Sequence, residues 1–92
     1  MTDIYSAVYQ VLDVSVASNR CLASSDAQIQ RALAQFRRSG TDRDATEQLE
    51  AISLQLHQLS IASLSGDSEQ RSEAIERLRA SAQVWMQRLP MQ

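Results

Sequence analysis

Three residues whose side chains take part in hydrolytic chemistry lie close together in the sequence. Glu50, Ser53 and His57 are spaced three and four apart, so a helix would carry all three on one face. A catalytic serine needs a strained turn that presents its hydroxyl and an oxyanion hole beside it, and a regular helix supplies neither. We therefore interpret His57 as a surface or interface residue and expect no enzyme activity.

The single cysteine and the single histidine restrict the other chemistry that the chain can do. Cys21 has no second cysteine with which to form an internal disulfide, and its neighbour Arg20 would point elsewhere on a helix. We expect an inert thiol. A zinc site needs three or four ligands, and His57 supplies one. No metal and no other cofactor is expected, because the sequence also lacks a glycine-rich phosphate loop.

The basic residues form one small cluster. All nine are arginines, and Arg37, Arg38 and Arg43 bracket Gly40. Cations in the last turn of a helix offset its dipole, which explains the first two; a docking point for an acidic partner is the alternative. With a formal net charge of −2, the chain has little attraction for phosphates, which disfavours a DNA-binding regulator. No nucleic-acid partner is expected.

Residues that begin and end helices divide the chain. Glycine takes the left-handed position after a helix, proline prevents its continuation, and Asp or Thr caps the start of the next one. The predicted ends are marked by Gly40, Gly66 and Pro90, and the predicted starts by Asp67 and by Thr41 or Asp42. These positions predict helices over 42–64 and 68–89.

Apolar residues recur at steps of three and four in both segments, as on a single buried helix face. They are Ala45, Leu49, Ile52, Leu56 and Leu59 in the first, and Ile75, Leu78, Ala82, Trp85 and Leu89 in the second. The segments are nearly equal in length and joined by few residues, which predicts an antiparallel hairpin of helices 42–64 and 68–89. The contact between these two apolar faces is here called the seam of the hairpin. We interpret Trp85 and Met86 as filling this seam; the alternative is that Trp85 anchors a partner.

The first forty residues are predicted to form two more helices. A helix from about Asp26 to Ser39 is indicated by the apolar stripe of Ile29, Ala32, Leu33 and Phe36. Upstream, a run of β-branched and aromatic residues favours a strand, but its polar residues recur at helical spacing. A break or kink at Ser24 and Ser25 is favoured. The fold class is therefore an all-α antiparallel bundle of four helices, or three if the first two are continuous, in one domain over 1–92.

Two apolar faces exceed what the hairpin needs. On the first helix the apolar arc covers more than half of the circumference, whereas a surface helix needs a stripe about 100° wide. Either this helix is the centre of its own bundle, or the edge with the two tyrosines is an interface. On the third helix, either the N-terminal helices cover the outward face, or a second copy or a foreign helix does. The candidate protein interface comprises Tyr5, Tyr9, Val16, Leu54, Ile61 and Leu64.

The expected function is non-enzymatic protein binding, with a protein partner, self-association as a homodimer, or both. A chain of 92 residues buries only about 60% of its unfolded surface, so added contacts matter for its stability. The candidates are a small bacterial adaptor, secretion chaperone, immunity protein or regulator that binds a partner helix; the alternative is a structural homodimeric scaffold without a specific client. The lone cysteine and the lack of signal-peptide features predict a cytoplasmic location, and no stretch is apolar enough to span a membrane.

Overall fold

The chain folds into four α-helices, with no strand among the residues that the structure describes. The structure is a computed structural model and describes residues 4–18, 23–40 and 42–89. The helices are α1 (Ile4–Ser18), α2 (Ala23–Ser39), α3 (Arg43–Ser65) and α4 (Ser68–Met86). The predicted all-α bundle of four helices is confirmed.

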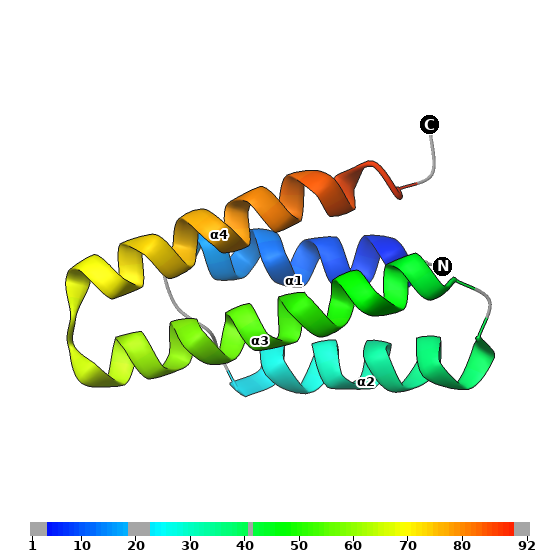
Figure 1. The fold of residues 1–92 in the computed structure, drawn as a ribbon, viewed down its shortest axis with the longest axis horizontal. Coiled ribbons are helices and arrows are strands. Elements are labelled where there is room, and N and C mark those ends of the chain that lie inside the picture. Colours follow the sequence, from blue (N-terminus) through cyan, green and yellow to red (C-terminus); the bar gives the residue numbers. More distant parts are fainter. Residues whose placement is uncertain (1–3, 19–22, 41, 90–92) are drawn as a thin grey trace.

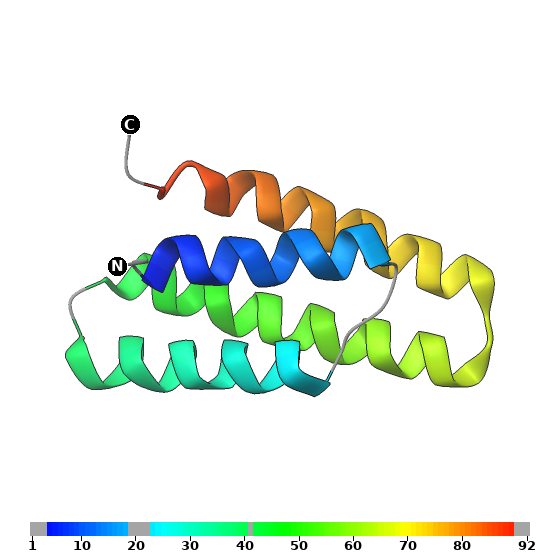
Figure 2. The same cartoon turned by 180° about the vertical axis from the view of Figure 1, so that it is seen from behind.

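The four helices lie side by side and alternate in direction (Figure 1). α3 packs on α2 and α4, and α1 packs on the same two helices from the other side, so α1 and α3 occupy opposite corners (Figure 2). Helices that follow one another in sequence are thus neighbours in space. Contact between the first and last helices closes the ring, and α3 with α4 forms the predicted antiparallel hairpin.

The predicted helix boundaries around the two glycines are confirmed. Gly40 and Gly66 have φ angles of 62° and 74°, the left-handed conformation that glycine adopts without strain. Asp42 caps α3 by accepting a hydrogen bond from the backbone N–H of Ala45 at 3.0 Å. Asp67 caps α4 in the same way through two backbone N–H groups. Both caps satisfy donors that the first turn of a helix leaves unpaired.

The last helix ends three residues before the predicted boundary at Leu89. α4 ends at Met86, and the next three residues donate backbone hydrogen bonds to carbonyls three positions earlier. This tighter turn pairs carbonyls that the helix end would leave free. Pro90, the predicted helix stop, lies outside the described residues.

The junction between the first two helices lies earlier than predicted. Ser24 and Ser25 fall in the first turn of α2 and not at a break, because α2 begins at Ala23. Ser25 is 5% exposed and so lies on the buried face of the first turn of α2. Residues 19–22, which include Cys21, lie outside the described residues.

One core joins all four helices. Every predicted seam residue of the hairpin is buried except Leu89, which is partly buried. Met86 is 46% exposed, so its predicted place in the seam is wrong. It follows the buried Trp85 by one position, which turns its side chain about 100° away from the core.

The wide apolar arc of α1 faces α2 and α4. Val8, Val11 and Leu12 are buried in the core, whereas Val14 is 49% exposed. Ser15 is fully buried among them, and its hydroxyl has no hydrogen-bond partner in the described part of the chain. An unpaired buried hydroxyl is destabilising, because the group loses water and gains nothing in return.

We therefore expect Ser15→Ala to raise the free energy of unfolding by about 1 kcal/mol relative to a matched control. The control is Ser72→Ala, which removes an exposed hydroxyl from the interior of α4 and gains the same helix propensity. Urea unfolding measures the free energy of unfolding of both variants. A Ser15→Ala variant no more stable than the control would show that the hydroxyl is paired.

Candidate protein-binding surface

The α1 part of the predicted interface lies against its own chain. Tyr5, Tyr9 and Val16 are partly buried and pack on the core. The Tyr5 ring meets the Phe36 ring edge-on, with centroids 5.3 Å apart, and its hydroxyl donates a hydrogen bond to Asp42 Oδ2 at 2.9 Å. These contacts give the α1 edge a structural role, and its role as an interface stays a prediction.

Trp85 connects the last helix to the first. Its ring is fully buried, with its centroid 5.9 Å from that of Tyr5, and its Nε1 donates a hydrogen bond to the Tyr5 backbone oxygen at 2.9 Å. The Arg88 guanidinium lies 5.5 Å from the ring centroid, within reach of a cation–π interaction. Trp85 therefore fills the seam, as predicted, and presents no surface to a partner.

The Asp42 carboxylate joins the start of α3 to α1 and to the turn that follows α4. It accepts hydrogen bonds from the backbone N–H of Ala45 and from the Tyr5 hydroxyl, and the Arg88 guanidinium lies 3.7 Å away. In that order of importance these groups hold the pKa of the carboxyl below its ordinary value of 3.8, against the opposing effect of burial. The charged form of Asp42 therefore stabilises the folded chain.

The α3 part of the predicted interface is exposed. Leu54, Ile61 and Leu64, here called the α3 stripe, are 58%, 52% and 87% exposed. α3 packs on α2 and α4 through its opposite face, and α1 lies at the far corner of the bundle. The N-terminal helices therefore do not cover this face, which answers a question that the sequence left open.

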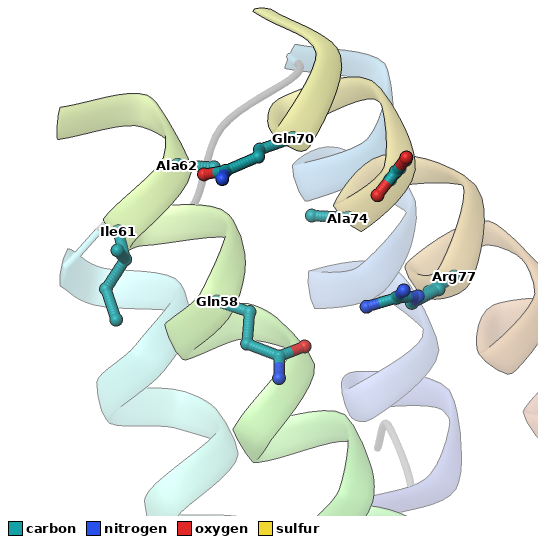
Figure 3. A pocket seen from close by; sticks show the side chains of 7 residues that line it. Gln58, Ile61, Ala62, Gln70, Ala74 and Arg77 are labelled. Atoms are coloured by element: carbon teal, nitrogen blue, oxygen red, sulfur yellow. The ribbon is translucent and has the colours of Figure 1, made fainter. Parts of the chain in front are cut away.

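A groove between α3 and α4 lies beside the α3 stripe and has a volume of about 300 Å³. Ala62 and the small side chain of Ala74 form its floor, and Gln58, Gln70 and Arg77 extend toward it from the two helices (Figure 3). Ile61 stands on the outer side of α3 at its edge. Small floor residues between long polar ones leave room for a side chain from outside.

A second groove, between α3 and α2, has a volume of about 470 Å³ and contains the three residues that suggested hydrolytic chemistry. Two of their side chains contact residues of α2 across the groove. The Ser53 hydroxyl accepts a hydrogen bond from Gln30 at 2.6 Å, and the Glu50 carboxylate pairs with Arg37 at 3.7 Å. Both partners belong to α2, so these contacts tie α2 to α3 across the groove. His57 lines the same groove and is exposed.

The arginines around Gly40 divide into paired and unpaired residues. Arg37 reaches Glu50, and Arg43 lies 4.0 Å from Glu47 in an i,i+4 pair on α3. Arg38 is exposed and has no ion pair within the described residues. Exposed pairs of this kind contribute little stability. Asp42 and Asp44 stand beside the same arginines, so this end of the molecule carries charges of both signs.

Charge distribution along α3 is a feature that the analysis of single residues missed. Its Asp, Glu and Arg residues all fall in positions 43–50, and positions 51–65 contain none. The α3 stripe lies wholly within this uncharged segment. A count of charged residues along each predicted helix would have found it, whereas the exposure of Val14 and Val84, at 49% and 53%, depends on packing that spacing alone does not fix.

Comparison with known proteins gives no relative: no family model, curated protein or solved structure matches the chain. Among the described residues no group of His, Cys, Asp and Glu is arranged to hold a metal ion. A search of the same residues found no helix with the length and apolar character needed to cross a membrane.

The Asp42 contacts predict a measurable pH dependence of stability. The stabilisation is complete above the unfolded-state pKa of 3.8 and is lost as the pH falls through the lower folded-state pKa. Asp42→Asn keeps a capping oxygen but removes the charge. We expect wild-type stability in urea to fall more steeply than that of Asp42→Asn between about pH 5 and pH 2.

Asp44→Asn is the matched control, because Asp44 is an exposed carboxylate in the same helical turn. It should retain the wild-type dependence on pH. Parallel curves for wild type and Asp42→Asn would contradict the assignment of Asp42 as the group responsible.

Proposed function

We propose that the chain is a non-enzymatic protein-binding module whose α3 stripe packs against the apolar face of a partner helix. One observation carries the proposal: three large apolar side chains stand exposed on a segment of fifteen residues, 51–65, that has no Asp, Glu or Arg. Single exposed leucines are ordinary on protein surfaces. An outward apolar row at helical spacing, without charges beside it on the same helix, is typical of a surface that another protein covers.

The form of the surface favours a helical partner. Leu54 and Ile61 lie one heptad apart, which matches the repeat of side chains along a facing helix. The described part of the chain offers no strand edge to which an extended peptide could add. The groove with Ala62 and Ala74 at its floor lies beside Ile61 of the α3 stripe and receives a side chain of the partner.

The contacts around the second groove support a binding role over catalysis. Glu50 and Ser53 are engaged with residues of α2, which leaves His57 without the serine and the acid that hydrolysis needs. A small adaptor, secretion chaperone, immunity protein or regulator in the bacterial cytoplasm is the class of protein that these properties suit.

The proposal predicts that polar substitutions in the α3 stripe abolish partner binding. Tagged wild type and Leu54→Gln/Ile61→Gln are used to capture proteins from the native host, and a partner identified in this way is titrated calorimetrically against each purified variant. Loss of both apolar contacts should weaken binding at least about tenfold, equivalent to about 1.4 kcal/mol.

Val84→Gln serves as the matched control, since it makes the same kind of change at a residue that is 53% exposed on α4. It should bind as wild type does, and circular dichroism should report the same helix content for all three proteins. A partner that binds wild type and the double variant equally would overturn the proposed function.

A further inference from the structure

The groove between α3 and α4 has two opposite charges on its α4 wall. Glu73 and Arg77 line it from exposed positions one helical turn apart, a spacing at which an acid and a following base commonly pair. Within the described residues neither side chain has an ion pair or a hydrogen bond, whereas Glu76 and Arg79 on the same helix pair at 2.9 Å. Arg77 instead extends toward the groove (Figure 3). Both charges are therefore available to a group from outside the chain.

The groove adjoins the α3 stripe, so a partner that covers Ile61 also meets the groove. Ile61 borders it, and Gln58 extends toward it from the same helix (Figure 3). A helix laid on this part of the stripe brings side chains beside Glu73 and Arg77. Covering a charge with apolar groups removes its water and is unfavourable, unless an opposite charge takes the place of the water. The partner must therefore supply both an acid and a base at this wall.

The groove is short. The Ser81 hydroxyl donates a hydrogen bond to Gln55 Oε1 at 2.7 Å, which joins α4 to α3 one turn beyond Arg77, and neither residue lines the groove. The α4 residues that do line it run from Gln70 to Arg77, which at 1.5 Å per residue is about 10 Å, or two helical turns. Two turns of a facing helix suffice for one apolar residue at the floor and two charged residues at its border.

We propose that the partner is an amphipathic helix that seats one leucine or methionine on the floor formed by Ala62 and Ala74. A basic residue of the same helix lies beside Glu73, and an acidic residue lies beside Arg77. The inference rests on the proposed function and names the chemistry of the partner's binding face. Charged residues at the border of an apolar contact set partner choice and direction between paired helices, and here their order along the partner sets the direction in which it lies.

The charges near the α3 stripe disfavour a membrane surface as the occupant. Binding to anionic lipid relies on basic residues beside the apolar face. Positions 51–65 contain none, and positions 67–77, which lead into and form the α4 wall, contain four acidic residues and two arginines. A protein helix needs only one charge of each sign at this wall, so it fits the groove better than an anionic surface does.

Selection from a phage-displayed library of amphipathic helical peptides tests the chemistry of the partner's face. Peptides are selected on the full wild-type chain and counter-selected on Leu54→Gln/Ile61→Gln, which retains only those that use the α3 stripe. The enriched peptides should carry leucine or methionine on the apolar face, bordered by a basic and an acidic residue one turn apart. Enriched peptides without this pair of charges would overturn the inference and leave the proposed function standing, since they still depend on the α3 stripe.

Exchange of the two groove charges tests their role directly, with fluorescence anisotropy of labelled peptides as the measure of affinity. Glu73→Arg/Arg77→Glu should weaken binding of the selected peptides at least about tenfold, and exchange of the acid and the base within the peptide should recover most of the loss. Glu76→Arg/Arg79→Glu is the matched control, because it exchanges an acid and an arginine of α4 that do not line the groove. It should bind as wild type does. Selected peptides that are indifferent to exchange of the groove charges contradict the inference.

Substitution at the floor tests the seat of the apolar side chain. Ala74→Leu fills the floor and should weaken peptide binding at least about tenfold, while Ala80→Leu, at an exposed position of the same helix, should have no effect. Circular dichroism checks that both variants are folded. A folded Ala74→Leu chain that binds as tightly as wild type would overturn the floor as the seat, and the charge exchange tests the same contact in a chain whose core is unchanged.

Vesicles that contain anionic lipid provide the competing test. Wild type should stay in solution when the vesicles are sedimented. Sedimentation of wild type but not of Leu54→Gln/Ile61→Gln would make the α3 stripe a membrane surface, against the inference and the proposed function together. A selection that returns no peptide dependent on the α3 stripe would overturn the inference alone, and titration of a host partner would then decide the proposed function.

Discussion

The burial of Trp85 is the interaction on which closure of the bundle depends. α1 and α2, α2 and α3, and α3 and α4 are consecutive in the chain and are held close by their connections. α1 and α4 have no such link, so side chains alone must join them. Trp85 does so by burying its whole ring and donating its N–H to the backbone of Tyr5. The Asp42 carboxylate holds the Tyr5 hydroxyl and fixes the same corner to α3.

This arrangement treats the two predicted binding faces differently. Tyr5 on α1 takes part in the closure contacts, while the outward face of α3 takes no part in the core. The proposed partner surface is therefore separate from the residues that hold the bundle together. Substitutions in the α3 stripe remove no core contact, so the proposed binding can be tested without unfolding the bundle.

The sequence predicted the hairpin well because its signals are local. Glycine at the positive φ of residues 40 and 66 and the Asp42 and Asp67 caps act within one helical turn, and the seam residues follow from spacing. The start of α2 was predicted too late because Ser25 packs into the bundle, and spacing along one helix does not report burial by other helices. The role of Tyr5 was missed because its partner Asp42 lies 37 residues away, and periodicity within one helix contains no information about such a contact.

The core is also uneven along its length, with consequences for motion. Trp85, Phe36 and Tyr5 cluster at one end, whereas Ala62, Ala74 and Ser25 are buried toward the other. Leu59 and Ile75 are also buried toward that end, so its packing is aliphatic, while the aromatic rings and the Trp85 hydrogen bond hold the other end. Where small side chains fill the core, local opening costs less free energy, so backbone amides beside Ala62 and Ala74 should exchange with solvent sooner than those near Trp85. The groove proposed to receive a partner's side chain lies at this aliphatic end.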